Sequence, residues 1–409
     1  MLFARIYDAL NDPVMGFIVD NTRTRWGKFK PWIAIGAVLS AVFTILLFTD
    51  FNLQGGAFVG CFAVFYLLWG MSYTSNDISY WSMLPALSID QKEREKIGAI
   101  ARICANIGLF FVVAGIVPLT GLLGEHFGGL QKGYFIFAVL VSSIMIAGQC
   151  VTLFGVKVAG LIADKRQSTP LRELLGIIYR NDQLFFTAIS MSLFMIGYVT
   201  TTSFGLYFFK YAYGDEGMYS IFAMILGVSQ ITALAIFPLF SKRFERRTLY
   251  SAAIILIAAG YIIFFLAPVT SMLFIGAGGI LIFIGQSFVQ LLMLMFLADS
   301  VDYGHWKLGK RNDSITFSLQ PLINKMGGAI SSGVVAAVVI ISGIKDAETA
   351  AEVSEAGLLM MKIAMLIFPM ICIIFSYIIY RKKYRIDSRF YAQILSDLRE
   401  RGELEGEVH

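Results

Sequence analysis

Two acidic residues lie one helical turn apart close to the start of the chain, inside an otherwise apolar segment. Asp8 and Asp12 share one helix face because side chains four positions apart are neighbours, and Asn11 lies beside them. Pro13 frees a backbone carbonyl nearby. Carboxylate, amide and carbonyl oxygens suit a small hard cation, whereas two close carboxylates can instead hold one proton. The segment predicts a site for Na⁺ or H⁺, the alternative being a structural ion pair with Arg5 or with a base on another helix.

A second polar group occupies the stretch YTSNDISYW at 73–81. Tyr73, Asp77 and Trp81 follow one another at helical spacing, and Thr74 leans toward the same side. A carboxylate beside an indole suits a sugar, whose apolar face stacks on the ring while the acid accepts its hydroxyl groups. An aromatic residue at the end of a membrane span can instead belong to the interfacial belt, but Asp77 lies well inside the apolar run.

Basic residues lie within two other apolar runs. Charged groups inside a membrane are costly and commonly mark an ion or substrate path. Arg102 is predicted to contact a sugar or to hold Asp77, with an inner gate or a snorkelling base as the alternative. Lys325, beside Gln320 and Pro321, needs an acidic partner from the first half of the chain.

The composition is that of a helical membrane protein. Only 15% of the residues are charged, 57% are hydrophobic and the mean hydropathy is +0.72, whereas soluble domains carry about 25% charged residues. Apolar runs of about 20 residues recur, each long enough for a ~30 Å hydrocarbon core. The three histidines, predicted in loops or at the terminus, argue against a histidine-built metal or catalytic site. The separated cysteines are predicted to be core residues without disulfides.

Eleven membrane spans are predicted from these runs. They cover 2–20, 31–49, 57–84, 97–121, 133–157, 183–210, 217–240, 249–267, 271–298, 314–342 and 357–380. Basic residues collect in alternate connections, which the positive-inside rule places in the cytoplasm together with the C-terminus.

The connection 158–182 divides the chain into residues 1–157, with five spans, and residues 183–385, with six; 386–409 form a cytoplasmic tail. Many transporters consist of two six-span halves, so we expect one helix to be absent before the first. Apolar stripes predict surface helices in the connection and in the tail, lying flat on the inner leaflet. The charged segments IDQKEREK, KRFERR and ADSVDYGHWK predict an inner gate that includes Arg94, Asp299 and Asp302.

Several of these motifs together resemble one family. RIYDALNDPVMGFIVDNTRTRWGKFKPW, YTSNDISYWSMLP, DQKERE, ADSVDYG and NKMGG are similar to motifs of the glycoside–pentoside–hexuronide:cation symporters, the melibiose-permease group of the major facilitator superfamily. The resemblance covers essentially the whole chain. It implies a twelve-helix fold in two bundles and cation-coupled sugar uptake by alternating access.

The resemblance also implies roles for individual residues. By position, Asp8, Asn11, Asp12 and Thr74 match the cation site, while Tyr73, Asp77, Trp81 and Arg102 match the sugar site. Lys325 matches a lysine near both sites. Gln290 stands where the melibiose permease has a sugar-facing tryptophan, which indicates a different glycoside.

The sequence therefore predicts a plasma-membrane symporter rather than an enzyme. Its expected partners are a small sugar, a monovalent cation (Na⁺, H⁺ or Li⁺) and the lipid bilayer, without a cofactor or a nucleic acid. The alternatives are a transporter of a lipid-like solute and a truncated relative that does not transport.

Overall fold

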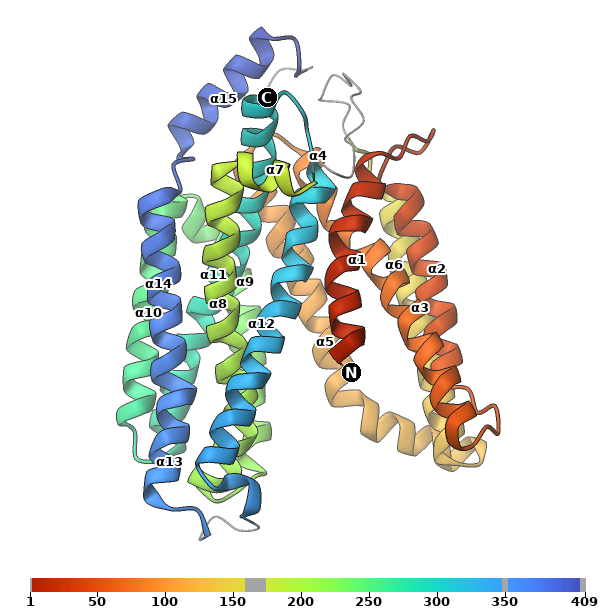
Figure 1. Cartoon of the computed structure of the whole chain (residues 1–409), viewed down its shortest axis with the longest axis vertical. Coiled ribbons are helices and arrows are strands. Elements are labelled where there is room, and N and C mark those ends of the chain that lie inside the picture. The colour runs from red at the N-terminus through yellow and green to blue at the C-terminus, as the bar shows by residue number, and fades with distance from the viewer. Residues whose placement is uncertain (1, 159–173, 348–351, 405–409) are drawn as a thin grey trace.

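The computed structural model describes residues 2–158, 174–347 and 352–404, with the backbone alone at residues 2–10 and a few isolated positions. Regular secondary structure is helical throughout this part of the chain. The helices form two bundles side by side, the first in red to pale orange and the second in green to blue (Figure 1). The predicted all-helical fold with two bundles is confirmed.

The elements follow one another along the chain with short connections. The first bundle contains α1 (Leu2–Asp20), α2 (Lys30–Leu47), α3 (Gly55–Ser82), α4 (Leu84–Leu87), α5 (Gln91–Phe127) and α6 (Leu130–Gly155). The second contains α7 (Leu174–Arg180), α8 (Asp182–Tyr207), η2 (Phe208–Tyr213), α9 (Met218–Ser241), α10 (Arg246–Leu266), α11 (Met272–Leu308), α12 (Asp313–Ile341), η3 (Ile344–Asp346), α13 (Glu355–Lys362), η5 (Ile363–Ile367), α14 (Phe368–Lys383) and α15 (Ser388–Glu400). Helices α1 and α3 contact α12, and α5 contacts α9 and α11, so these helices join the bundles.

Ten of the described helical segments are long and apolar enough to cross a membrane. Helix α1 is an eleventh of similar length, but it carries Arg5, Asp8, Asp12 and Asp20 within 19 residues. The eleven predicted spans thus correspond to ten helices that are long and apolar enough and to α1, which has the length alone. The surface helix predicted in the connection, with the apolar stripe Leu171, Leu174, Leu175 and Ile178, is seen from Leu174 onward as α7, and its first turn lies outside the described residues.

Two helices extend well beyond their predicted spans. Helix α5 begins after Asp90, whose carboxylate accepts a hydrogen bond from the Lys92 amide, and α11 ends only at Gly309, in the left-handed region at φ 69°. His126 and His305 therefore lie in the last turns of helices, and their assignment to loops was wrong. Charged residues do not end a helix when a cap lies further along the chain.

The cysteine prediction was wrong for two residues. Cys104 and Cys150 are exposed on the helix surfaces, whereas Cys61 and Cys372 are partly buried. A membrane helix can present an apolar face outward as readily as inward, so an apolar run does not place a cysteine in the core.

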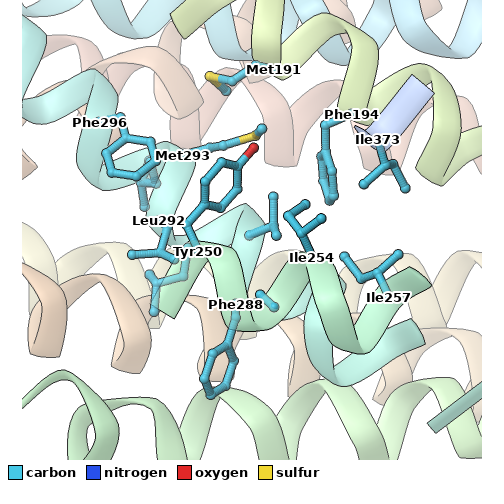
Figure 2. Packing of buried hydrophobic residues seen from close by; sticks show 14 of the residues in the cluster. Met191, Phe194, Tyr250, Ile254, Ile257, Phe288, Leu292, Met293, Phe296 and Ile373 are labelled. Atoms are coloured by element: carbon cyan, nitrogen blue, oxygen red, sulfur yellow. The ribbon is translucent and has the colours of Figure 1, made fainter. Parts of the chain in front are cut away.

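The second bundle is built around α11. Its residues from Gln286 to Val301 are buried except for Gln290, and a helix that is apolar on all sides belongs inside a bundle. Figure 2 shows Leu292, Met293 and Phe296 beside Tyr250 of α10, with Phe194 and Ile373 nearby. This core fixes the helix that carries Asp299 and Asp302.

Glycine allows α10 and α11 to touch backbone to backbone. A Cβ on Gly260 would lie 2.7 Å from the Gly278 carbonyl oxygen, and a Cβ on Gly278 would lie 2.9 Å from the Gly260 carbonyl oxygen. Two turns further, a Cβ on Gly285 would lie 2.7 Å from the Ala253 carbonyl oxygen. Any side chain here would force the helices apart. We call this contact the glycine seam.

A similar close contact joins the two bundles. A Cβ on Gly16 of α1 would lie 2.5 Å from the Ser314 carbonyl oxygen at the start of α12. The two helices therefore approach each other at their backbones, next to the end of the molecule that carries α4 and α15 (Figure 1).

The tail helix α15 packs on the protein rather than lying flat on the membrane. Tyr391, Ile394 and Leu398 of its apolar stripe are buried in the core of the second bundle. Trp306 of α11 donates a hydrogen bond to Asp397 at 2.7 Å. The prediction was wrong because α11 continues past residue 298 and offers the tail a protein surface to cover.

Candidate functional site

The carboxylate of Asp12 lies buried between three helices. Lys325 of α12 donates a hydrogen bond to its Oδ1 at 2.8 Å, and Thr74 of α3 donates to the same oxygen at 3.3 Å. The lysine has the first-half acidic partner that the sequence predicted. A buried ion pair of this kind is costly to break by removing one partner, so α1, α3 and α12 are held together here by charge.

One turn along α3, Asp77 and Trp81 meet Arg102 of α5. The guanidinium carbon of Arg102 lies 4.9 Å from the centroid of the Trp81 ring, within the range of a cation–π interaction. Asp77 is partly buried and lies in the electrostatic field of both Arg102 and Lys325. The residues Asp12, Thr74, Asp77, Trp81, Arg102 and Lys325 form what we call the central cluster.

The remaining predicted binding residues lie around this cluster. Asn11 is partly buried on α1, and Tyr73 is half-exposed on α3. Gln290 is partly buried on α11 and forms no hydrogen bond with the central cluster in the described part of the chain. The side chains of Arg5 and Asp8 lie outside the described residues, so pairing of Asp8 with Asp12 stays a prediction.

Arg94 is the centre of a second group of charges, at the end of the molecule that carries α4 and α15. Its fully buried guanidinium donates to Asp302 of α11 at 2.6 Å and lies 3.9 Å from Asp299. It also donates to the Pro85 carbonyl at 2.8 Å and to the Tyr391 hydroxyl at 3.0 Å. Arg94, from the first bundle, thus contacts Asp299 and Asp302 of the second bundle and Tyr391 of the tail helix α15.

Two further bases extend this group. Arg246 of α10 contacts Glu95 of α5 at 2.6 Å and Asp299 at 2.5 Å. Arg311 contacts Asp302 at 2.5 Å and donates to the Pro85 carbonyl at 3.2 Å. We call Arg94, Glu95, Arg246, Asp299, Asp302 and Arg311 the ion-pair cluster; its members come from both bundles, and it brings together all three predicted gate residues.

A third ionic contact fastens α1 to α12. Lys28 donates to Asp20 at 2.9 Å and to Asp313 at 2.7 Å, while Asp20 accepts a hydrogen bond from the Ile315 amide at 2.9 Å. Asp20 therefore caps the first turn of a helix in the other bundle, where an anion is favoured. Burial alone would lower the pKa of Lys28, but the two carboxylates outweigh it and raise that pKa, so the lysine stays charged.

Tyr391 connects the tail to the ion-pair cluster. Its hydroxyl donates to Asp302 at 2.8 Å. Burial raises the pKa of Tyr391 well above its usual value, which keeps the proton needed for this hydrogen bond. The tail is thereby tied to a carboxylate that also holds Arg94.

We expect Tyr391→Phe to loosen this end of the molecule without unfolding it. Loss of a buried hydrogen bond to a charged group costs about 1.5–3 kcal/mol, so the fraction of open molecules should rise on the order of 10-fold or more. Maleimide labelling of a cysteine at Ala86, in a chain otherwise free of cysteine, measures that fraction. Tyr377→Phe is the matched control, because that hydroxyl bonds Ser251 within one bundle; equal labelling in the two variants would refute the role of Tyr391.

Sequence reasoning missed several members of these contacts. Glu95 and Arg246 lie in segments whose charge was noticed, but their pairing is visible only when α5 and α10 are placed together. For Arg311, the nearby Asp313 is the one feature of the sequence that indicates an ion pair. Tyr391 was predicted as part of an apolar stripe, and its hydroxyl partner lies 89 residues away.

Comparison with known proteins agrees with this arrangement of helices. A family model described as MFS/sugar transport protein matches residues 1–388. The chain belongs to this family. Its members are transport proteins rather than enzymes, as the sequence predicted, and the resemblance to the sugar:cation symporters of the major facilitator superfamily is confirmed at the level of the family.

Individual relatives support the same assignment. A lactose permease of Lactobacillus delbrueckii subsp. bulgaricus is 31% identical over 96% of this chain and 64% of its own length. A raffinose carrier protein of Pediococcus pentosaceus is 32% identical over 97% of this chain and 63% of its own length. The chain thus spans slightly less than two thirds of these relatives.

A solved structure shares the fold at low identity. The transporter FucP, a major facilitator superfamily protein in the outward conformation, superposes with a TM-score of 0.68 at 11% identity, covering 94% of this chain and 91% of FucP. The predicted superfamily fold is confirmed, and the chain is a multi-pass membrane protein.

Proposed function

We propose that this protein is a secondary active transporter that couples the entry of Na⁺ or H⁺ to the uptake of a glycoside. The observation that carries the proposal is the continuity of the central cluster. Thr74 reaches Asp12, the candidate cation ligand, while Asp77 and Trp81 on the same helix belong to the candidate sugar site. A change at one site is thus transmitted to the other along two turns of α3.

The ion pair supplies a means of coupling. Asp12 holds Lys325 at 2.8 Å, so a cation or proton that takes the carboxylate competes with the lysine. The displaced lysine can then act on Asp77 and on a bound sugar. Binding linkage is reciprocal, so the sugar must favour cation binding by the same factor.

The sugar half of the cluster has matching chemistry. The Nε–H of Arg102 is buried and has no hydrogen-bond partner in the described part of the chain, which costs about 1–3 kcal/mol. A sugar hydroxyl would satisfy it, while the Trp81 ring offers an apolar face and Asp77 accepts hydroxyl protons. The names of the relatives, lactose permease and raffinose carrier, favour a galactoside or a related glycoside as the substrate.

The ion-pair cluster serves as the inner gate in this proposal. It closes the end of the molecule where basic residues collect, and the positive-inside rule places this end and the C-terminus in the cytoplasm. Alternating access then requires these pairs to separate as the substrate is released.

Uptake by vesicles containing the chain tests the proposal. Labelled α- and β-galactosides, β-xylosides and β-glucuronides would be offered with an imposed Na⁺ gradient and then with an H⁺ gradient. We expect one class to accumulate above its external concentration with one of the two gradients. Absence of gradient-driven accumulation of every glycoside, by protein shown to be inserted, would refute the function.

A further inference from the structure

A polar pair of the second bundle lies beside the central cluster. Gln230 of α9 donates a hydrogen bond to the hydroxyl of Tyr198 on α8 at 3.2 Å. Gln230 is buried and Tyr198 is partly buried, so the pair belongs to the interior of the protein. Polar groups inside a membrane protein are costly, and they commonly mark a substrate path.

The pair lies at about the same depth in the molecule as Arg102. Near the ion-pair cluster, Lys92 of α5 donates a hydrogen bond to the carbonyl of Ser241, where α9 ends. Arg102 follows Lys92 by ten residues on α5, a rise of about 15 Å. Gln230 precedes Ser241 by eleven residues on α9, a rise of about 17 Å. The two side chains are therefore level with each other on neighbouring helices.

Close packing of α9 on α5 separates this part of α9 from lipid. The two helices contact each other, and a Cβ on Gly227 would lie 2.4 Å from the ring of Phe110 on α5. Gln230 lies three residues after Gly227 and therefore on the same side of α9. The turn that carries Gln230 thus faces the first bundle rather than the membrane.

Tyr198 lies across from the candidate sugar-binding groups of the first bundle. Arg102 is in the electrostatic field of Asp77 and of Tyr198. The rings of Trp81 and Tyr198 pack against the same hydrophobic cluster. The central cluster is therefore bordered by α3 and α5 on one side and by Tyr198 of α8 on the other.

The side chain of Tyr198 is held at both ends. Its ring centroid lies 6.4 Å from that of Phe194, which is fully buried, and the two ring planes differ by 11°. Gln230 holds the hydroxyl group at the other end. A side chain that is already ordered loses little entropy when it binds a ligand.

Two hydrogen-bond donors at this level have no acceptor within the described residues. The Tyr198 oxygen accepts the hydrogen bond from Gln230, which leaves its own O–H proton available. The buried Nε–H of Arg102 is the second donor. One donor comes from each bundle, and neighbouring hydroxyl groups of a sugar ring can accept from both.

We propose that Tyr198 is a sugar-binding residue of the second bundle and that Gln230 is its positioning residue. In the complex, the Tyr198 hydroxyl donates a hydrogen bond to a sugar hydroxyl, while Arg102 and Asp77 hold the same sugar from the first bundle. The inference rests on the proposed function and adds to it a contact through which the sugar joins the two bundles.

The test uses sugars that each lack one hydroxyl group. KM is measured for uptake of methyl galactoside, xyloside and glucuronide and of their single-deoxy analogues, by the unmodified chain and by Tyr198→Phe. We expect KM of the transported parent glycoside to rise about 2- to 10-fold in Tyr198→Phe, because one neutral hydrogen bond is lost. One analogue already lacks the hydroxyl that Tyr198 contacts, so its KM should differ by less than about 2-fold between the two proteins.

Tyr211→Phe is the matched control, because this hydroxyl donates to the Ala347 carbonyl at 3.1 Å within the second bundle. It should leave KM of every sugar within about 2-fold of the unmodified value. Gln230→Met should reproduce the pattern of Tyr198→Phe. Combined with Tyr198→Phe it should add less than about 2-fold, since Gln230 acts through the Tyr198 hydroxyl.

The outcomes separate this inference from the proposed function. An equal rise in KM for every analogue, no change for any, or the same pattern in Tyr211→Phe would overturn the role of Tyr198 and leave the transporter standing. Additive effects of Gln230→Met and Tyr198→Phe would overturn the positioning role of Gln230. If the unmodified chain accumulates none of the glycosides, the proposed function fails and this inference fails with it.

Discussion

Asp12→Asn is expected to abolish gradient-driven accumulation, with the internal-to-external sugar ratio falling to about one. The substitution removes the charge that Lys325 contacts at 2.8 Å and that a coupling cation requires. Lys325, whose side chain is 31% exposed, then loses this charged contact, so the loss of stability should be smaller than the cost of breaking a fully buried pair, about 3–5 kcal/mol. Accumulation and exchange of labelled sugar in vesicles, with Na⁺ and H⁺ gradients imposed in turn, measure the effect.

Two controls separate loss of coupling from loss of folding. Asp50→Asn alters an exposed acid in the connection between α2 and α3 and should leave accumulation unchanged. The double change Asp12→Asn with Lys325→Gln removes both charges and should restore stability without restoring accumulation. If Asp12→Asn alone still concentrates sugar with intact cation dependence, the assignment of the cation site is wrong.

The second large effect is expected from Arg94→Gln. This change leaves Asp302 buried with one base fewer and takes donors from the Pro85 and Ser88 carbonyls. Breaking a buried pair by removing one partner costs about 3–5 kcal/mol. The equilibrium constant between the closed and open forms should therefore shift toward the open form by more than about 100-fold. The labelling rate of a cysteine at Ala86 should rise by a comparable factor, and uptake should slow because the gate no longer closes.

A charge-balanced variant tests the cause. Arg94→Gln combined with Asp302→Asn removes both members of the pair, and we expect labelling to return most of the way to that of the unmodified chain. Arg243→Gln removes an exposed base near the same end and should change nothing. Labelling that is equally fast in the single and double variants would show that packing, rather than charge, holds this end closed.

The fold and the central cluster follow largely from local patterns in the sequence. Hydropathy gives the membrane helices, because each is long enough to be recognised by itself. Helical spacing places Tyr73, Asp77 and Trp81 on one face. The cost of a charge in an apolar span demands a partner for Lys325, and the structure supplies Asp12.

The contacts of the ion-pair cluster could not be predicted in the same way. Arg94 and Asp302 are 208 residues apart, and six charged groups offer many pairings of similar chemistry. Only the packing of α5 against α11 selects among them. The prediction that α15 lies on the membrane was wrong for a related reason. An amphipathic stripe fits a membrane surface and a protein surface equally well, so its position cannot be assigned until the neighbouring helix is known.

The glycine seam has a mechanical consequence. With Gly260 and Gly278 in backbone contact, α10 and α11 pack more closely than any side chain at these positions would allow, and most of the remaining α11 surface is buried. Such close packing favours movement of the second bundle as one body. The bundles meet at the backbone contact between Gly16 and Ser314. Lys28 and Asp20 fasten α1 to α12 beside this contact, so relative movement of the bundles has to break these ionic contacts. A side chain added at the glycine seam would force α10 away from α11 within the second bundle. A side chain added at Gly16 would instead force α1 away from α12 and so separate the two bundles.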